Sequence, residues 1–427
     1  MPQQNITSER DTRARASAQL RHARRAPRVL YVWDDEYPWD VRTEKVCAAL
    51  LEHGCDVHLV ARNPRWAPEC ERLPEGFVHR MPPWRALGKT LDAALAFPAF
   101  FNPRWVALLS RTIRDVHPDV VIVRDLPLCP TALHVARKFG LPIILDMAEN
   151  YPALIRSTWD AGRHSLIDYA VRNPAAVAAV ERYCVRRVDR VMVVIEESGE
   201  RLVRDLGVPP EHIDVVSNTP ARVRAEHPPR PLRGDRPLEV AYLGLFEIPR
   251  GIGELVSAAA ELRGRLPVRL TLVGDGRDGE LFRAQAASLG LSDDQIVFTG
   301  YLPHGDALAV VARADVGVVP HHAVEAWNTT IPNKLFDYMA AGLAVITSDA
   351  APAARIVRTT GAGEVFRAGD ARDLAHAIER LADPRRCADA AHAGRAAILR
   401  QYHWERDAER LVRAVSMLAR HREPAVA

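Results

Sequence analysis

Short runs of β-branched residues alternate with helical patterns along most of the chain, and this alternation restricts the fold more than any other feature. Runs of this kind, separated by amphipathic helical stretches, are typical of a parallel sheet covered by helices on both faces. The first series contains RVLYVW (28–33), DVHLVA (56–61), DVVIVRD (119–125), LPIILDMAE (141–149), RVMVVI (190–195) and IDVVSN (213–218). The second series contains LEVAYLG (238–244), VRLTLVG (268–274), QIVFTG (295–300), ADVGVVP (314–320), LAVITS (343–348) and GEVF (363–366).

The two series are separated by a stretch that suits neither strands nor helices. Residues 219–237, TPARVRAEHPPRPLRGDRP, contain five prolines and few apolar residues, which indicates a linker between domains. We therefore predict an α/β chain of two Rossmann-like, doubly wound domains, 28–220 and 238–400, with a linker at 221–237. Two such domains facing each other form a cleft, and ligands bind outside the carboxyl ends of their strands.

Composition excludes several classes of protein. The 427 residues are 48% hydrophobic and 26% charged, with a formal net charge of +3, which is ordinary for a globular chain. The small charge argues against a dedicated nucleic-acid binder. Six cysteines are scattered without a C-x-x-C pair, so we expect reduced thiols in a cytoplasmic protein.

Two segments raise the question of a membrane. Residues 1–27 form a basic tail without an apolar run, which excludes a secretory signal and leaves a disordered tail or an electrostatic anchor to an anionic membrane. No stretch reaches the length of a spanning helix. The most apolar one, LDAALAFPAFFNPRWVALLS (91–110), is interrupted by prolines. It predicts two short helices, packed in the core or touching the inner face of the membrane or a lipid-like acceptor.

The stretch NTTIPNKLFDYMAAGLAVITSD, 328–349, is the most informative local pattern. Pro332 suits the first helical turn, and Gly342 suits the position just after the helix. Helical spacing places Lys334 and Asp337 on the face opposite the apolar residues Leu335, Phe336 and Met339. The plainest interpretation is a capped surface helix with a solvated lysine–aspartate pair.

The same stretch would also suit a phosphate group. The free N–H groups and the positive dipole end at a helix start favour anions. Thr329 and Thr330 could add hydroxyl donors, and Lys334 could add a charge. The local pattern leaves both interpretations open.

Residues 274–279, GDGRDG, match the glycine fingerprint of nicotinamide-binding domains. The acidic residue expected at the end of the next strand is absent, because QIVFTG ends in Thr299 and Gly300. We therefore interpret the motif as a tight glycine-rich turn. His321 and His322 follow a strand, but no nearby cluster completes a metal site, so we expect them to line the cleft or the surface.

The whole chain from about 28 to 420 resembles the retaining glycosyltransferases of the GT-B fold, family four. In the second half, YLGLFEIPRGIGELVSAAAEL resembles the first motif of the donor-binding domain, and the stretch at 328–349 resembles the donor signature that ends in an acid before MAAG. In the first half, WDVRTEKVCAALLEHGCDVHLVAR, IILDMAENYP and ERYCVRRVDRVMVVIEESGERLVRDLGVPPEHIDVVSN resemble segments of the acceptor-binding domain. The segment YHWE resembles the start of a C-terminal helix, here 401–427, that crosses back to the first domain.

This resemblance implies a set of site residues. The cations that stabilise the leaving diphosphate would be Arg250 and Lys334, and Glu149 would act near the reacting sugar. Asp337 would hold the ribose hydroxyls. The remaining expected donor-binding residues are Gly244, Gly251, Gly300, Tyr301, Thr329, Thr330 and Leu335, and the expected acceptor-binding residues are Arg42 and Asp146.

Three positions depart from the common family pattern. Thr329 stands where many members have an acid, Leu245 where an arginine often follows the first glycine, and Ala148 where many have a histidine near the sugar. These departures keep two alternatives open, namely a nucleotide-sugar-binding protein without activity and a nucleotide-sugar epimerase of the same fold.

The resemblance implies transfer of a sugar from a nucleotide-diphosphate sugar to a sugar, lipid-linked or small-molecule acceptor. The product would belong to a polysaccharide, a glycolipid or another glycoconjugate. No metal and no cofactor other than the donor co-substrate are expected, and no nucleic-acid partner.

Overall fold

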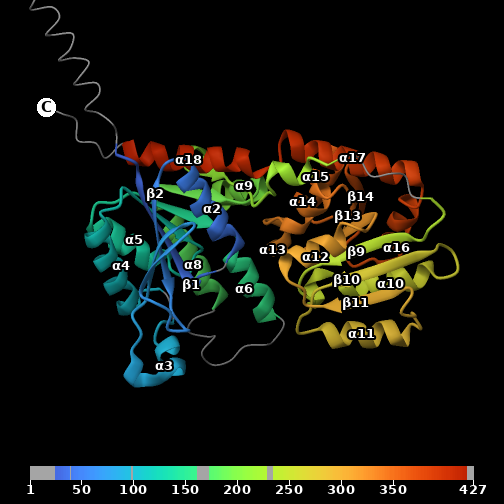
Figure 1. Cartoon of the computed structure of the whole chain (residues 1–427), viewed down its shortest axis with the longest axis horizontal. Helices are drawn as coiled ribbons and strands as arrows, with labels where there is room; N and C mark the ends of the chain where they lie inside the picture. Colours follow the sequence, from blue (N-terminus) through green and yellow to red (C-terminus); the bar gives the residue numbers. More distant parts are fainter. Residues whose placement is uncertain (1–24, 39, 98–99, 161–172, 228–233, 421–427) are drawn as a thin grey trace, which may run out of the picture.

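The computed structural model describes residues 25–38, 40–97, 100–160, 173–227 and 234–420. Within these ranges the chain forms two α/β domains that lie side by side, each built around its own sheet (Figure 1). Most of the predicted basic tail (1–24), part of the predicted linker (228–233) and the last seven residues (421–427) lie outside the described residues.

The N-terminal domain contains an eight-stranded sheet. Its strands are β1 (Arg28–Glu36), β2 (Asp56–Arg62), β3 (Cys70–Leu73), β4 (Gly76–Arg80), β5 (Val120–Arg124), β6 (Ile143–Met147), β7 (Arg190–Val193) and β8 (Ile213–Val215). Their order across the sheet is β3-β4-β2-β1-β5-β6-β7-β8. All neighbours are parallel except β3 and β4, which form an antiparallel pair at one edge.

The helices of this domain are α2 (Val41–Glu52), α3 (Gly88–Ala94), α4 (Pro103–Val116), α5 (Cys129–Lys138), α6 (Tyr151–Asp160), α8 (Pro174–Val185) and α9 (Glu196–Leu206). Short 3-10 turns are η1 (Arg85–Leu87), η2 (Pro210–His212) and η3 (Arg222–Ala225). Their starts follow local chemistry: Asp40 caps α2 by accepting a hydrogen bond from Thr43 N, and Asn102 caps α4 just before its first residue, a proline.

The C-terminal domain contains a six-stranded parallel sheet in the order β11-β10-β9-β12-β13-β14. These strands are β9 (Leu238–Leu243), β10 (Val268–Val273), β11 (Ile296–Gly300), β12 (Val316–Val319), β13 (Ala344–Ser348) and β14 (Gly363–Phe366). The helices are η4 (Ile248–Arg250), α10 (Ile252–Leu262), α11 (Gly279–Ser288), α12 (His304–Val311), α13 (Glu325–Asn328), α14 (Asn333–Ala340), α15 (Ala351–Thr360), α16 (Ala371–Arg380), α17 (Pro384–Arg400) and α18 (Trp404–Arg420). The predicted boundary at 221–237 falls between β8 and β9.

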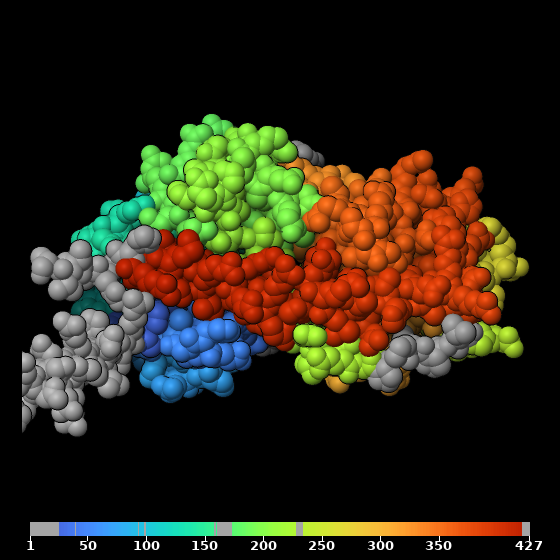
Figure 2. All heavy atoms as spheres, turned by 90° about the horizontal axis from the view of Figure 1, so that it is seen from above, coloured from blue at the N-terminus to red at the C-terminus, as the bar shows by residue number. Residues whose placement is uncertain are grey.

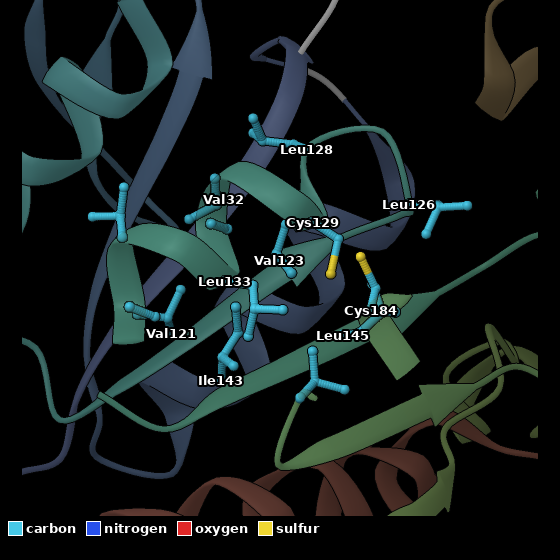
Figure 3. Packing of buried hydrophobic residues seen from close by; sticks show 14 of the residues in the cluster. Val32, Val121, Val123, Leu126, Leu128, Cys129, Leu133, Ile143, Leu145 and Cys184 are labelled. Carbon is cyan, nitrogen blue, oxygen red and sulfur yellow. The ribbon is translucent and has the colours of Figure 1, made fainter. Parts of the chain in front are cut away.

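The central strands are buried on both faces, as their continuous apolar sequences predicted. Every residue of β5, VVIVR, and of β13, AVITS, is buried. In the N-terminal domain, side chains of β5 and β6 pack under α5 and α8 (Figure 3). The sulfur atoms of Cys129 and Cys184 point toward each other in this core, and all six cysteines are free thiols.

The last helix connects the two domains. Helix α17 packs on α14 and β13 of the C-terminal domain, and the chain then continues into α18, which lies on α2. Leu411 and Val415 of α18 are buried with Val46 and Leu50 of α2 in one apolar cluster. Seen from above, the two helices form a continuous band across both domains (Figure 2).

Polar contacts join the domains on the side where the carboxyl ends of the sheets approach each other, which we call the interdomain face. Helix α6 lies next to α13 (Figure 1), and Arg156 Nη1 lies 2.7 Å from Glu325 Oε2. Nearer α18, Arg355 of α15 contacts Glu197 at 2.6 Å and Glu196 at 2.8 Å at the start of α9. The loops after β6 and β12 therefore lie close together.

Two expectations about local structure have clear outcomes. The stretch 91–110 contains parts of two helices, α3 and α4, as predicted. The β3–β4 hairpin was not predicted, because β3 is a short edge strand with exposed or half-buried side chains and no alternating apolar pattern.

Among the described residues, no helix has both the length and the apolar character needed to span a bilayer.

Candidate active site

The loop after β9 approaches α14 so closely that its glycines have no room for a side chain. Gly244 has a φ of +139°, and a Cβ atom there would lie 2.8 Å from Lys334 Nζ. Gly251, the first residue after η4, has a φ of +71°, and its Cβ would lie 1.8 Å from the carbonyl oxygen of Pro320. The two glycines of the motif therefore allow the β9 loop to pack against α14 and the β12 loop.

Helix α14 is fixed to the sheet by its buried face. The Tyr338 hydroxyl accepts a 2.9 Å hydrogen bond from Leu243 N of β9, and a Cβ at Gly317 of β12 would collide with the Tyr338 ring. Leu335, Phe336 and Met339 are fully buried, as the helical spacing predicted. Pro332 lies one residue before the helix rather than in its first turn.

The two predicted cations lie together on this scaffold. The side chain of Lys334 is only 8% exposed, and its Nζ lies 4.1 Å from the centre of the Tyr242 ring. This Nζ has no hydrogen-bond partner among the described residues. Burial lowers the pKa of Lys334 well below its ordinary value, and the charge of Arg250 lowers it further. Arg250 itself contacts Glu247 at 3.2 Å. An anionic ligand would therefore relieve a repulsion that the protein leaves uncompensated at Lys334.

A histidine and a tryptophan complete this cluster. The sequence predicted only that His321 lines the cleft or the surface, and it assigned no role to Trp327. His321 follows β12 by two residues and is 1% exposed. Its ring packs on Trp327 of α13 with the ring centres 4.1 Å apart, and the guanidinium of Arg250 lies 5.2 Å from the centre of the same Trp327 ring. His322 points elsewhere, to Glu254 of α10 at 2.9 Å.

Glu149 brings a carboxylate of the N-terminal domain to this region. It follows β6, and although its side chain reaches solvent, groups of both domains lie close enough around it to remove much of its water. Loss of water and the neighbouring Asp125 raise the pKa of Glu149 to about 7, while Arg250 and Arg124 act in the opposite direction. The structure thus places Glu149 close enough to Arg250, across the interdomain face, for the charge of Arg250 to affect its pKa.

A second carboxylate lies near Glu149. Burial and the charge of Asp125 raise the pKa of Asp34, at the carboxyl end of β1, to about 6. Asp125 is itself buried, has a φ of +59° and accepts a 3.0 Å hydrogen bond from Ala148 N. Three acids therefore gather at the carboxyl ends of β1, β5 and β6, and the charge of Asp125 disfavours the charge on the other two.

The hydroxyls of the two threonines, which were predicted to bind the donor, are engaged in other contacts in this structure. Thr330 Oγ1 donates to the carbonyl oxygen of Ala148 at 3.2 Å. Thr329 Oγ1 donates to the carbonyl oxygen of Glu325 at 2.8 Å and accepts from Asn150 Nδ2 at 2.8 Å. Each hydroxyl has a single hydrogen, so neither has one left for a phosphate. In this arrangement they tie the loop before α14 to the N-terminal domain.

The predicted acceptor-binding pair is a buried ion pair instead. Arg42 is 3% exposed and Asp146 is fully buried. Arg42 Nε donates to both carboxylate oxygens of Asp146 at 3.0 Å, and the Tyr31 hydroxyl donates to Asp146 Oδ2 at 3.0 Å. These groups are enclosed at the end of β6, where they support the loop that carries Glu149, and their expected contact with an acceptor remains a prediction.

Only some of the backbone N–H groups at the start of α14 are available to a ligand. Leu335 N already donates to the carbonyl oxygen of Pro332 at 3.1 Å, and Pro332 has no N–H group. The N–H groups of Asn333 and Lys334 are the ones left to face a ligand at this helix start.

Lys334 and Asp337 do not form the solvated pair of the plainest interpretation. Asp337 Oδ1 accepts a 2.8 Å hydrogen bond from Arg224 in η3, whereas Lys334 packs on the sheet. Asp337 therefore lies toward the segment that joins the domains. Its expected contact with a ribose remains a prediction.

The glycine-rich turn at 274–279 supports the loop after β9, which contains Gly244 and Phe246. A Cβ at Gly274 would lie 2.1 Å from the carbonyl oxygen of Gly244, and one at Gly276 would lie 2.5 Å from that of Phe246. Gly274 N donates to the carbonyl oxygen of Gly300 at 3.1 Å, and the adjacent Tyr301 is 76% exposed. The turn thus aligns the loops after β9 and β11.

No group of three or more acidic, cysteine or histidine side chains suited to a metal occurs in the part of the chain that the structure describes.

Comparisons with known families agree with this geometry. Residues 39–219 match the family described as "Glycosyl transferase 4-like domain", and residues 237–383 match "Glycosyl transferases group 1". Glycogen synthase of Mycobacterium tuberculosis is 27% identical over 299 residues, which cover 69% of this chain and 67% of that protein. The 2-deoxystreptamine glucosyltransferase of Streptomyces kanamyceticus is 31% identical over 198 residues, covering 43% and 48% of the two chains.

Solved structures share the whole fold at low sequence identity. Sucrose-phosphate synthase of Thermosynechococcus elongatus superimposes with a TM-score of 0.73 at 18% identity, covering 92% of this chain and 100% of that one. HepE of Anabaena, solved in complex with UDP and glucose, gives a TM-score of 0.66 at 14% identity, covering 92% and 100%. These likenesses confirm the predicted arrangement of two Rossmann-like domains.

Proposed function

We propose that this chain, which belongs to the GT-B glycosyltransferases of the family-four type, transfers its sugar from a nucleoside diphosphate with retention of configuration and without a metal ion. Glycosyl transfer in glycan biosynthesis is the shared activity of the relatives, and neither an epimerase nor a binding protein without activity is favoured by them. The observation that carries the proposal is the buried, unpartnered Lys334 beside Arg250, at the carboxyl end of the C-terminal sheet.

The donor site follows from that pair of cations. Breaking the bond between sugar and phosphate places negative charge on the diphosphate, and preorganised cations and N–H groups stabilise this charge most effectively. Lys334 and Arg250 supply the charge, and the start of α14 supplies N–H groups. With two cations in place, the leaving group needs no divalent ion in this proposal.

Glu149 would act on the sugar side of the same bond. Its pKa of about 7 allows it to hold or release a proton near neutrality, so it can accept a hydrogen bond from a hydroxyl of the donor sugar or of the acceptor. In a retaining transfer the acceptor hydroxyl attacks from the side that the leaving diphosphate vacates. Its oxygen forms the new bond, the bond from sugar to phosphate oxygen breaks, and the hydroxyl proton passes to that phosphate oxygen.

A panel of UDP-, GDP-, ADP- and TDP-sugars tests the donor site by thermal stabilisation in the presence of EDTA. We expect one base to stabilise the wild-type protein, and we expect Arg250→Ala and Lys334→Ala to abolish the shift. The matched control is Arg358→Ala, which removes an exposed arginine of α15 and should leave the shift intact. Stabilisation by no donor, with or without added magnesium, would contradict the proposal.

Transfer and its stereochemistry need a separate measurement. The donor identified by the panel is incubated with sugar, lipid-linked and small-molecule acceptors, and the anomeric configuration of the product is read by NMR. Retention of the donor configuration is expected. An inverted product would disprove the proposed same-face attack, and interconversion of the donor sugar without transfer would indicate an epimerase.

A peripheral contact with an anionic membrane remains part of the proposal. Between residues 84 and 101, several large apolar side chains are at least 39% exposed, namely Trp84, Leu87, Leu91, Leu95, Phe97 and Phe101. Arg85 and Lys89 lie among them. Sedimentation with phosphatidylglycerol vesicles, but not with phosphatidylcholine vesicles, is the expected result, and Leu87→Ser with Leu91→Ser should abolish it. Equal recovery with both vesicle types, or with neither, would contradict this contact.

A further inference from the structure

The structure leaves one buried histidine of the donor domain without a role. His321 is 1% exposed, and neither of its ring nitrogens has a hydrogen-bond partner among the described residues. Most buried polar side-chain atoms in proteins are hydrogen-bonded, so an exception requires an explanation. The neighbouring His322 provides a contrast, since its Nε2 is paired with Glu254.

The surroundings of His321 indicate the kind of ligand. Burial, Lys334 and Arg250 all lower the pKa of His321, so the ring is a neutral imidazole with one N–H donor and one acceptor nitrogen. Lys334 Nζ is a second buried nitrogen without a partner. Trp327 contacts both the His321 ring and the Arg250 guanidinium. Two cations and an N–H donor are thus gathered in one small region, a combination that suits a phosphate rather than a sugar.

We propose that His321 is a third diphosphate-binding residue of the donor site, which donates its ring N–H to the phosphate attached to the sugar. This inference rests on the proposed function. We assign His321 to the phosphate distal from the nucleoside because charge develops there as the bond to the sugar breaks, and Lys334 and Arg250, which are proposed to stabilise that charge, lie near His321. The hydrogen bond becomes stronger as negative charge develops on that phosphate, so His321 favours the transition state over the bound donor.

Loss of the His321 N–H should change the affinity for a nucleoside diphosphate but not the affinity for a nucleoside monophosphate. A hydrogen bond to a charged group, once lost, lowers affinity by roughly ten- to a hundredfold. Removing the His321 N–H should therefore weaken binding of inorganic pyrophosphate and of UDP, GDP, ADP or TDP, whichever the protein binds. Binding of the corresponding monophosphate should stay within about twofold, because the distal phosphate is absent.

Two variants separate hydrogen bonding from packing. His321→Phe keeps an aromatic ring against Trp327 and removes the N–H group, whereas His321→Gln keeps an N–H donor and removes the ring. His322→Gln is the matched control one residue away. We expect the Phe variant to lose diphosphate affinity, the Gln variant to retain more of it, and the control to behave as wild type. With substrates, kcat of the Phe variant should fall more than KM rises.

Calorimetric titration of each variant with pyrophosphate, nucleoside diphosphate and nucleoside monophosphate provides the readout. Wild-type affinity for diphosphate in His321→Phe would overturn the inference and leave the donor site intact. Equal losses for mono- and diphosphate in both His321 variants, together with a lower melting temperature, would assign His321 to packing and overturn it too. A wild-type protein that binds no diphosphate would overturn the proposed function along with it.

Discussion

Replacing Lys334 by methionine should stabilise the ligand-free protein while removing donor binding. An ammonium group that is buried without a hydrogen-bonding partner destabilises a fold by several kcal/mol. Its contact with the Tyr242 ring, 4.1 Å from Nζ, offsets about 1–2 kcal/mol of that. Methionine keeps an unbranched apolar chain of similar length in the same space. The net gain expected for Lys334→Met is therefore about 1–3 kcal/mol in the free energy of unfolding.

The pH dependence gives this prediction a distinctive signature. The folded-state pKa of Lys334 lies well below its ordinary value, so the folded protein binds this proton less tightly than the unfolded chain. Below the folded pKa the full penalty is present, and it is relieved as pH rises toward the unfolded value of about 10.4. Wild-type stability should consequently rise across this window relative to the variant, by up to about 1.4 kcal/mol per pH unit.

Urea and thermal unfolding of both proteins between pH 6 and 9 measure the difference. In the absence of ligand, the melting temperature of the variant should be higher by about 2–4 °C for each kcal/mol gained. With nucleoside diphosphate at a hundred times its Kd, wild type gains about 2.7 kcal/mol and the variant gains none. Arg358→Met serves as the control for losing a cation. A variant that is less stable than wild type at every pH, yet still binds diphosphate, would refute the reasoning.

Three further substitutions test other parts of the site. Gly244→Ala should lower kcat/KM at least tenfold and the free energy of unfolding by about 1–2 kcal/mol. The reason is that the added Cβ would lie 2.8 Å from Lys334 Nζ, at a backbone φ of +139°. Steady-state kinetics and urea unfolding measure the two effects. Glu149→Gln should remove any titration near pH 7 from the profile of kcat/KM. Because the folded pKa of Glu149 is raised, its stabilising contribution is lost as pH rises through 7, and a wild-type curve parallel to that of the variant would contradict this. Asp146→Asn leaves Arg42 buried without its charge partner and should cost about 3–5 kcal/mol in urea unfolding, whereas an unchanged stability with weaker acceptor binding would restore the original acceptor role.

The sequence predicted the fold well because the fold depends on local periodicity. Runs such as those of β5 and β13 are apolar throughout and buried throughout, so pattern and environment agree. The β3–β4 hairpin was missed because β3 has little apolar burial to impose a pattern. At α14 the spacing correctly identified the buried residues, but it placed Lys334 on the polar face. A long lysine stem can reach the sheet surface from such a position.

The contacts that sequence analysis did not anticipate at the site share one physical cause, namely that they join residues far apart in sequence. Thr329 and Thr330 looked free to bind phosphate because their partners, Asn150 and Ala148, lie in the other domain. Asp146 looked available for the acceptor because the sequence does not show that Arg42 is held against it. The family resemblance indicated these positions along the chain, but their hydrogen bonds could be assigned only from the structure.

The contacts of the two threonines also connect the two halves of the proposed site. Thr330 is hydrogen-bonded to Ala148, and Thr329 is hydrogen-bonded to Asn150. The loop before α14 therefore contacts both sequence neighbours of Glu149. The same loop leads directly into the helix that carries Lys334. A change in the position of α14 on donor binding would therefore be transmitted to Glu149 through two hydrogen bonds and a few residues of backbone. In this way the acid of one domain is tied to the segment that is proposed to bind the leaving group in the other, and Thr329 joins the two halves of the proposed site at a position where many family members have an acid.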